Sequence, residues 1–496
     1  GRKLVLWSAR RQIARRAQHY PALPAALNAV AKGLSHGMTA GLAAEREEFS
    51  RIAFEPACRN LLNLFFQQER AKRRDTWVGA DVRSESRIST VAVVGAGTMG
   101  AGIAQLAATR GYPVILRDID QAALERGMKQ IESLTRKAVR KRVFSESEGD
   151  AALHRIRQTT ELEPLADADL VIEAIVERLD VKRKLFADID NVVPAHTIIA
   201  SNTSALPINE MAAATIRVDR VAGLHFFNPV HKMPLVEVVR SAQTSDETIA
   251  ALVDLVRALG KTPIVVGEGP GFLVNRILFP YLDEAVRLVC EGIPVEQIDR
   301  EARRFGLPMG PLALLDTVGI DIGADAAHTL SSLSIESSPA PQRLADMVAA
   351  GHLGQKSGEG FYTYRKGRRR SPAVRAQVSD QTPRMPDSQE LGGETLSGVQ
   401  QRLVFALINS AADCLQEGIV GEPWMVDLGM VLGTGFPPFR GGPMKLVESW
   451  GSDQVIGTLN VLSETCGPRF RPSPWLIPEK PAETTTAKSS VQELPH

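Results

Sequence analysis

The stretch that decides the fold is Val91-Ala92-Val93-Val94-Gly95-Ala96-Gly97-Thr98-Met99-Gly100. Its four leading apolar residues predict a buried strand, and the GxGxxG spacing predicts a tight turn into a helix. Gly95 permits the turn, Gly97 lets the backbone approach a pyrophosphate, and Gly100 lets helix and strand pack closely. The helix N-terminus offers unpaired N–H groups and a partial positive charge to phosphates. We therefore expect a dinucleotide-binding turn made of Gly95, Ala96, Gly97 and Gly100.

An acidic residue follows the second predicted strand at the spacing that such a site requires. The strand Pro113-Val114-Ile115-Leu116 is followed by Asp118, close to the position, about 20 residues on, of a carboxylate that binds the ribose hydroxyl. A carboxylate there repels a 2′-phosphate, so the sequence favours NAD over NADP. Arg117 is adjacent and could soften that preference, which leaves NADP as the alternative.

Working outward from this turn, short β-branched runs alternate with helical stretches from residue 89 to about residue 266. This alternation is typical of a parallel sheet with helices on both faces. Helical patterns take over further along the chain and are interrupted by a segment rich in Arg, Pro and Ser. We expect a helical segment over residues 1–86 and a Rossmann-type doubly wound α/β domain over 87–268. A first all-α domain is expected over 269–365, a linker over 366–395 and a second all-α domain over 396–480. The tail, 481–496, is expected to be disordered.

The two all-α domains are predicted from an internal repeat. Asn275-Arg276-Ile277-Leu278-Phe279 is echoed by Gln401-Arg402-Leu403-Val404-Phe405. The first copy ends at Glu291-Gly292-Ile293 and the second at Glu417-Gly418-Ile419, and each is followed by a turn rich in Gly and Pro. Two copies of one helical unit, packed together, account for this pattern.

The composition excludes several classes of function. The chain has 496 residues, a net charge of +1 and 44% hydrophobic residues, so neither nucleic acid nor an anionic membrane is expected as a partner. No apolar run approaches the ~20 residues needed to span a bilayer. The four cysteines lie far apart, which argues against structural zinc and disulfides and fits a reducing compartment.

Two ionisable residues interrupt apolar strands. His225 lies in Val221-Ala222-Gly223-Leu224-His225-Phe226-Phe227, and Glu237 lies in Leu235-Val236-Glu237-Val238-Val239. An unpaired charge there would cost several kcal/mol, so we expect the two side chains to meet. A carboxylate that fixes the imidazole tautomer leaves the other ring nitrogen free to take a proton from an alcohol. A histidine that is merely satisfied within the core is the alternative.

Further polar residues follow the ends of predicted strands, on the ligand side of a doubly wound sheet. Glu173 and Glu177 follow Leu170-Val171-Ile172, and Ser201-Asn202-Thr203-Ser204 follows Ile198-Ile199-Ala200, although helix capping alone could explain the second group. Asn275 could reach over the cleft from the helical domain, or could be a surface residue. His231 is expected at the surface.

These residues together resemble the L-3-hydroxyacyl-CoA dehydrogenases, and most closely the dehydrogenase half of the bacterial multifunctional fatty-acid oxidation α subunits. The similarity covers about residues 87 to 365, with an additional C-terminal domain of the multifunctional proteins matching the second copy. The motifs that carry it are long and in the expected order, at 95–100, 173–177, 201–204, 223–229, 269–276 and 354–362.

The resemblance implies NAD-dependent oxidation of a 3-hydroxyacyl-CoA in β-oxidation. His225 would be the base with Glu237 as its partner, and Ser204 and Asn275 would bind the substrate around its 3-oxygen. The residues implied as dinucleotide contacts are Met99, Asp118, Glu177, Lys182, Asn228 and Lys356. Gln401 stands where the first copy has Asn275, so we expect a packing role there.

The resemblance also raises expectations about the rest of the protein. The family's multifunctional members carry an enoyl-CoA hydratase half before the dehydrogenase, and only its last helices and the linker are expected in residues 1 to about 75. We therefore expect no hydratase activity from this chain alone. A bacterial cytoplasmic location, a thiolase subunit as partner, and a mainly structural, acyl-CoA-binding role in a complex with that subunit are further expectations. The last is an alternative to catalysis. A dehydrogenase acting on a different 3-hydroxy acid is another.

Overall fold

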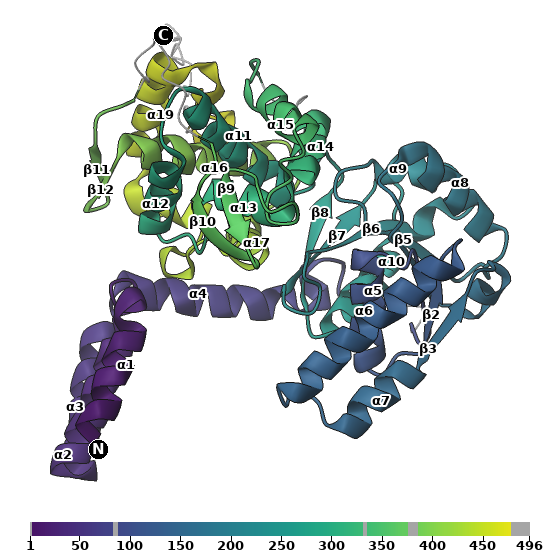
Figure 1. Ribbon diagram of the computed structural model, residues 1–496, viewed down its shortest axis with the longest axis horizontal. Coiled ribbons are helices and arrows are strands. Elements are labelled where there is room, and N and C mark those ends of the chain that lie inside the picture. The colour runs from purple at the N-terminus through teal and green to yellow at the C-terminus, as the bar shows by residue number, and fades with distance from the viewer. Residues whose placement is uncertain (1, 83–87, 331–334, 375–384, 478–496) are drawn as a thin grey trace, which may run out of the picture.

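The computed structural model describes residues 2–82, 88–330, 335–374 and 385–477. Figure 1 shows an α/β body beside a helical body, with helix α4 (Pro56–Ala71) running along both and three further helices projecting as an arm. The tail 481–496, expected to be disordered, lies outside the described residues. Among the described residues, no helix has the length and hydropathy needed to cross a membrane.

The α/β body is built on one eight-stranded sheet with the order β3-β2-β1-β4-β5-β6-β7-β8. The order reverses between β1 and β4, the place where doubly wound sheets bind ligands. The strands are β1 (Val91–Val94), β2 (Val114–Arg117), β3 (Ile156–Thr159), β4 (Leu170–Glu173), β5 (Ile198–Ser201), β6 (Val221–Phe226), β7 (Leu235–Arg240) and β8 (Thr262–Gly267).

One strand pair departs from the expected parallel arrangement. All neighbouring strands are parallel except β6 and β7, which are antiparallel. The connection between these two strands is short, and a short connection can join only antiparallel neighbours, because a parallel crossover needs a dozen or more residues. This local reversal places His225 directly opposite Glu237 in the register of the sheet.

Helices cover both faces of the sheet, which confirms the Rossmann-type fold class. The first of them, α5, is rich in Ala and Gly and is almost wholly buried. The helices of this body are α5 (Thr98–Thr109), α6 (Gln121–Arg140), α7 (Glu146–His154), α8 (Leu179–Asp190), α9 (Ile208–Ala212) and α10 (Asp246–Ala258), with short 3-10 turns η2 (Glu163–Asp167) and η3 (Val218–Arg220).

The helical body contains both copies of the repeat, and the first helix of one packs against the first helix of the other. The first copy comprises α11 (Val274–Cys290), α12 (Val295–Phe305), α13 (Pro311–Val318), α14 (Ile320–Leu330) and α15 (Ala340–Ala349). The second comprises α16 (Gly398–Gln416), α17 (Pro423–Thr434), α18 (Pro443–Trp450) and α19 (Ser452–Cys466), with η5 (Pro438–Arg440), η6 (Pro468–Phe470) and η7 (Pro474–Leu476).

The segment 366–395, expected as a linker, contains regular structure in its described part. β9 (Tyr362–Arg365) pairs with β10 (Arg368–Pro372), and β11 (Gln389–Leu391) pairs with β12 (Glu394–Leu396), both antiparallel. The residues of β10 are mostly exposed, so this strand lacks the alternating apolar pattern by which a strand is predicted. Gln401 has the expected packing role, because its amide donates to the carbonyls of Asp387 and Leu396.

Each copy of the repeat uses a buried aspartate to hold its third helix. Asp299 accepts hydrogen bonds from the backbone of Leu312 and Ala313 at the start of α13. Asp427 does the same for Met444 and Lys445 at the start of α18. These are the N–H groups that a helix leaves unpaired at its first turn, and the matched arrangement shows that the sequence repeat is a structural one.

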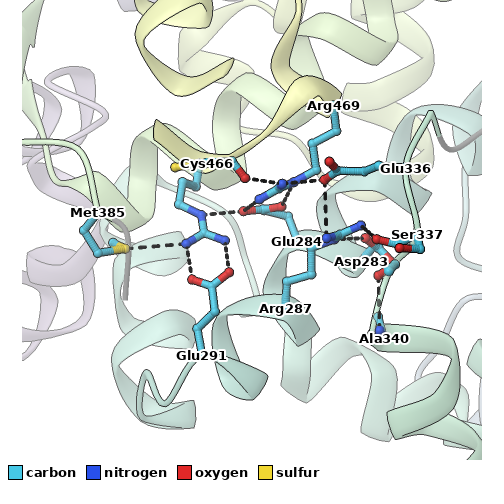
Figure 2. Close-up of polar contacts among 12 residues, drawn as sticks. Asp283, Glu284, Arg287, Glu291, Glu336, Ser337, Ala340, Met385, Cys466 and Arg469 are labelled. Carbon is cyan, nitrogen blue, oxygen red and sulfur yellow. Dashed lines mark hydrogen bonds and ion pairs between the residues drawn. The ribbon is translucent and has the colours of Figure 1, made fainter. Parts of the chain in front are cut away.

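A buried ionic cluster joins the two copies (Figure 2). The Arg402 guanidinium of α16 contacts Glu284 of α11 and also Glu291, the residue that follows this helix, whose carboxylate lies 2.7 Å from Nη2. Arg469 of η6 donates to Glu284 at 2.7 Å and to Glu336 at 2.6 Å. Although burial opposes it, the two guanidinium groups lower the pKa of Glu284. Such a network fixes the register between α11 and α16, because any slip would leave a buried charge unpaired.

The N-terminal helices are α1 (Arg2–Ala17), α2 (Ala22–His36), α3 (Met38–Ile52) and α4, followed by η1 (Arg74–Thr76). α4 contacts both bodies: Gln68 donates to Thr262 of β8 at 3.0 Å, and Asn60 donates to the carbonyl of Phe439 at 2.9 Å. Apolar side chains on these helices and the turns between them are exposed, among them Trp7, Phe49, Phe54, Phe65 and Phe66.

Asp427 predicts a pH-dependent stability. Burial raises its pKa to about 7, although its backbone hydrogen bonds oppose the shift. A folded-state pKa above the unfolded one stabilises the fold fully below about pH 4 and less as the pH rises to about 7. Asp427→Asn keeps an accepting oxygen and cannot ionise. It should flatten the fall in unfolding free energy between about pH 5 and about pH 8 by ~2 kcal/mol.

Urea unfolding at several pH values measures this effect. Asp453→Asn, at an exposed position of α19, is the matched control and should keep the pH dependence of the parent protein. An Asp427→Asn variant whose stability follows the parent curve at every pH would contradict the assignment.

Candidate active site

The glycine turn after β1 has the geometry of a dinucleotide site. Gly95 has a φ of 105°, and a Cβ there would lie 2.6 Å from the carbonyl oxygen of Ala174. A Cβ on Gly100 would lie 1.8 Å from the carbonyl oxygen of Gly95, whereas one on Gly97 would meet nothing within 4 Å. Helix α5 starts at this open position with no side-chain cap. Its first N–H groups are therefore available to phosphate oxygens, and the residues present fit NAD.

Asp118 lies beside this turn at the end of β2. Its Oδ2 accepts a hydrogen bond of 2.7 Å from the backbone N–H of Ala96. Arg117, which left NADP open, points elsewhere, since its Nε donates to the carbonyl of Thr160 at 3.3 Å. Met99 is half-buried and packs against the core beneath the turn. The carboxylate is thus held beside the glycine turn, and the neighbouring Arg117 guanidinium is engaged elsewhere.

His225 and Glu237 meet as the sequence predicts. The two residues face each other across β6 and β7, and His225 Nδ1 lies 2.6 Å from Glu237 Oε2. Glu237 is fully buried and His225 is 6% exposed. The imidazole packs against Phe227 and Phe272. Among the described residues, its Nε2 has no hydrogen-bond partner, so a proton on Nδ1 leaves the Nε2 lone pair available.

The second oxygen of Glu237 links the sheet to the helical body. Glu237 Oε1 accepts hydrogen bonds from the backbone N–H groups of Leu273, at 3.1 Å, and Val274, at 2.9 Å. These groups lie at the N-terminus of α11, where helices leave donors unpaired. Asn275 is the next residue, partly buried on the first turn of the helix. One carboxylate therefore positions both the imidazole and the helix that carries Asn275.

Glu177 and Ser204 form a second polar group beyond the ends of β4 and β5. Glu177 Oε1 accepts from Thr203 Oγ1 at 2.5 Å, and from the backbone N–H and the hydroxyl of Ser204 at 2.8 and 3.2 Å. Burial would raise the pKa of Glu177, but Lys182 and these hydrogen bonds outweigh it and lower the pKa. Asn202 accepts from the backbone N–H of Phe226 at 2.9 Å, which ties this segment to β6.

A buried ion pair supports that group from below. The Lys182 ammonium lies 2.6 Å from Glu173 and 3.2 Å from Glu177, and the Lys182 side chain is 1% exposed. Glu173 also accepts from Ser201 Oγ at 2.6 Å. Lys182, expected as a dinucleotide contact, is thus buried against Glu173 and Glu177. Glu173, which the sequence places with Glu177 on the ligand side of the sheet, is fully buried and supports Glu177 through Lys182.

The remaining residues that the sequence analysis singled out are Asn228, His231 and Lys356. Asn228 is exposed just after β6, on the same edge of the sheet, and His231 is exposed, as expected. Lys356 lies in the helical body, where its ammonium pairs with Asp321. Its closest described charge partner is therefore in the first helical copy, not at the glycine turn.

Comparison with known proteins matches most of the chain to one family. Residues 90–269 match the NAD binding domain of 3-hydroxyacyl-CoA dehydrogenase, and residues 271–364 and 399–488 each match its C-terminal domain. The fatty acid oxidation complex subunit alpha of Shewanella sp. (strain MR-4) is 37% identical over 487 residues, which cover 98% of this chain and 68% of that protein. The same subunit of Shewanella oneidensis is 36% identical, over a match that covers 95% of this chain and 66% of that protein.

Solved structures agree with this assignment. The 3-hydroxybutyryl-CoA dehydrogenase of Escherichia coli superposes with a TM-score of 0.68 at 30% identity, covering 79% of this chain and 98% of that one. The (S)-3-hydroxybutyryl-CoA dehydrogenase of Ralstonia eutropha is 43% identical with a TM-score of 0.53, covering 56% of this chain and all of that one.

The matched ranges of this one family include the glycine turn, the carboxylate after β2 and both helical copies. The chain belongs to the 3-hydroxyacyl-CoA dehydrogenase family and is an NAD-dependent oxidoreductase of fatty acid oxidation.

Proposed function

We propose that this chain oxidises (S)-3-hydroxyacyl-CoA to 3-ketoacyl-CoA with His225 as the general base. The contact between His225 Nδ1 and Glu237 Oε2, at 2.6 Å, carries this proposal. It supports a single tautomer, with the proton on Nδ1 and the lone pair on Nε2. An isolated core histidine would not need a fully buried carboxylate that is itself held by two backbone N–H groups.

In the proposed reaction, Nε2 of His225 takes the proton of the 3-hydroxyl while the hydrogen on the same carbon leaves as hydride. Bound NAD supplies the hydride acceptor. Glu237 stabilises the imidazolium that forms, because its carboxylate remains ionised beside the ring. Both hydrogens are thereby accounted for, and the carbon–oxygen bond becomes a carbonyl.

Ser204 and Asn275 are proposed to bind the 3-oxygen of the substrate from opposite sides of the cleft. The Ser204 hydroxyl donates to Glu177 at 3.2 Å and would turn from that carboxylate to donate to the substrate oxygen. The Asn275 amide is delivered by α11, whose first turn is held by Glu237. A hydrogen bond from each would favour the more polarised oxygen of the transition state. The acyl-CoA substrate would accordingly lie between the α/β body and the helical body.

The proposed contacts with NAD centre on the turn of Gly95, Ala96, Gly97 and Gly100. Asp118 would accept from the adenosine ribose, and Met99, Glu177 and Asn228 would line the remaining path along the sheet edge. Lys182 would act through Glu177, since its ammonium is buried against that carboxylate. Lys356 would join the cofactor contacts only by leaving its pair with Asp321.

A second candidate function is a structural, acyl-CoA-binding role in an assembly with a thiolase partner. The name that the relatives carry, subunit alpha of a fatty acid oxidation complex, favours some such assembly, and the exposed apolar side chains of α1–α4 are consistent with a covered surface. Absorbance at 340 nm with acetoacetyl-CoA and NADH separates the two candidates, because a purely structural chain would not turn over. The free 3-keto acid in place of its thioester tests whether CoA is required.

Replacing the base should remove chemistry and leave cofactor binding intact. His225→Gln is expected to lower turnover by about 10² to 10⁴, the usual share of a general base. The dissociation constant for NADH should stay within about twofold, because the phosphate-binding turn is built from other residues. Stopped-flow turnover and NADH fluorescence titration measure the two quantities.

His154→Gln, at the exposed end of α7, is the control and should behave as the parent protein. If His225→Gln retains parental turnover, or loses NADH binding and turnover in equal measure, the role assigned to His225 is wrong.

Breaking the buried pair under Glu177 should destabilise the fold. Lys182→Met leaves Glu173 buried without its cation, which costs about 3 to 5 kcal/mol. Arg183→Met, next along α8, removes only an exposed pair with Glu210 at 3.9 Å and should cost less than about 1 kcal/mol. Urea unfolding of both variants gives the comparison, and equal losses would refute a structural role for the Lys182 pair.

A further inference from the structure

The connection between β6 and β7, residues 227–234, lies next to the proposed active site. It leaves β6 two residues after His225 and carries Asn228. His231 and Lys232 are exposed at its tip, whereas Val230 is 4% exposed. The conformation of this short segment therefore determines where Asn228 lies relative to the edge of the sheet.

A buried lysine from another part of the chain holds this connection. The Lys261 ammonium donates to the carbonyl oxygen of Val230 at 2.6 Å and to that of Met233 at 2.7 Å. The neighbouring backbone N–H of Thr262 donates to the carbonyl of Pro234 at 2.8 Å. The turn between α10 and β8 thus fixes three carbonyls of the connection.

The burial of Lys261 is costly and calls for a compensating role. The residue is 6% exposed, and among the described residues it forms no ion pair with a carboxylate. Burial, with a smaller contribution from Arg110, lowers the pKa of Lys261 to about 8. The amine is therefore still protonated near neutral pH. Without it, the carbonyls of Val230 and Met233 would be left without these bonds inside the protein.

In a second contact, the same connection packs against the cofactor helix. The Val230 side chain lies against Gly102 of α5, the helix that begins at the glycine turn. A Cβ on Gly102 would lie 2.9 Å from Val230 Cγ2 and 3.1 Å from its Cβ. Val230 fits there because Gly102 has no side chain, so the connection packs directly against the cofactor helix.

We propose that Lys261 is a positioning residue for dinucleotide binding. Its ammonium holds the 227–234 connection against α5, and this places Asn228 where it contacts the cofactor. The inference rests on the proposed function, in which Asn228 contacts NAD. Lys261 itself touches neither cofactor nor substrate. It acts through the backbone of Val230 and Met233.

Lys261→Met, which keeps the aliphatic length and removes the ammonium, tests the proposal in the full chain. We expect the dissociation constant for NADH, measured by fluorescence titration, to rise about tenfold, and the KM for acetoacetyl-CoA at saturating NADH to stay within about twofold. Lys232→Met, at the exposed tip of the same connection, should leave both unchanged. A variant that is only less stable, with parental NADH affinity in its folded fraction, would overturn the proposal.

An independent perturbation comes from the other side of the contact. Gly102→Ala should weaken NADH binding in the same way, because its methyl group displaces Val230. The double variant Gly102→Ala with Val230→Ala should recover at least half of the loss on a logarithmic scale. A Gly102→Ala variant that binds NADH as the parent does would contradict the proposed role of the packing between Val230 and α5.

Asn228→Ala separates failure of this inference from failure of the proposed function. A weaker NADH complex is expected for both Asn228→Ala and Lys261→Met. If only Lys261→Met weakens binding, Lys261 does not act through Asn228 and the proposal falls, while the assignment of His225 is unaffected. If His225→Gln keeps full turnover, the proposed chemistry falls, and the NADH titrations still report on Lys261.

Discussion

Glu237 is bonded through one oxygen to the imidazole of His225 and through the other to the N-terminus of α11. A buried carboxylate with partners on both sides cannot move without leaving one of them unsatisfied. The orientation of the imidazole and the approach of the helical body are therefore set by the same group. The antiparallel pairing of β6 with β7 places this carboxylate opposite His225.

The helical copies support that arrangement from a distance. Helix α11 is held against α16 near its C-terminal end, where Arg402 contacts Glu284 within the helix and Glu291 directly after it (Figure 2). The second copy has Gln401 at the position of Asn275 and uses it to bind backbone carbonyls. In this chain the second copy thus keeps the fold of the first and serves to brace it. Ionic contacts suit this role, because they define one register where apolar packing would tolerate several.

How far the sequence predicts this structure depends on whether a feature leaves a local pattern. The turn at Gly95, the alternation of strands and helices and the repeat are all written in neighbouring residues, and so is an ionisable residue such as Glu237 inside an apolar strand. β3 lacks such a pattern, because Arg157 and Gln158 are exposed on an edge strand. The contacts of Lys261 join residues that lie 28 and 31 positions apart in sequence, so no local pattern of composition or spacing predicts them.

The tautomer of His225 tests the central claim most directly. In the protein with ¹⁵N-labelled histidine, and with His225→Gln to assign the signal among the nine histidines, long-range ¹H–¹⁵N spectra report which ring nitrogen bears the proton. Our account predicts a proton on Nδ1, donated to Glu237, and an unprotonated Nε2 in the neutral ring. A neutral ring protonated at Nε2 would contradict the account, since that nitrogen could then accept no proton from an alcohol.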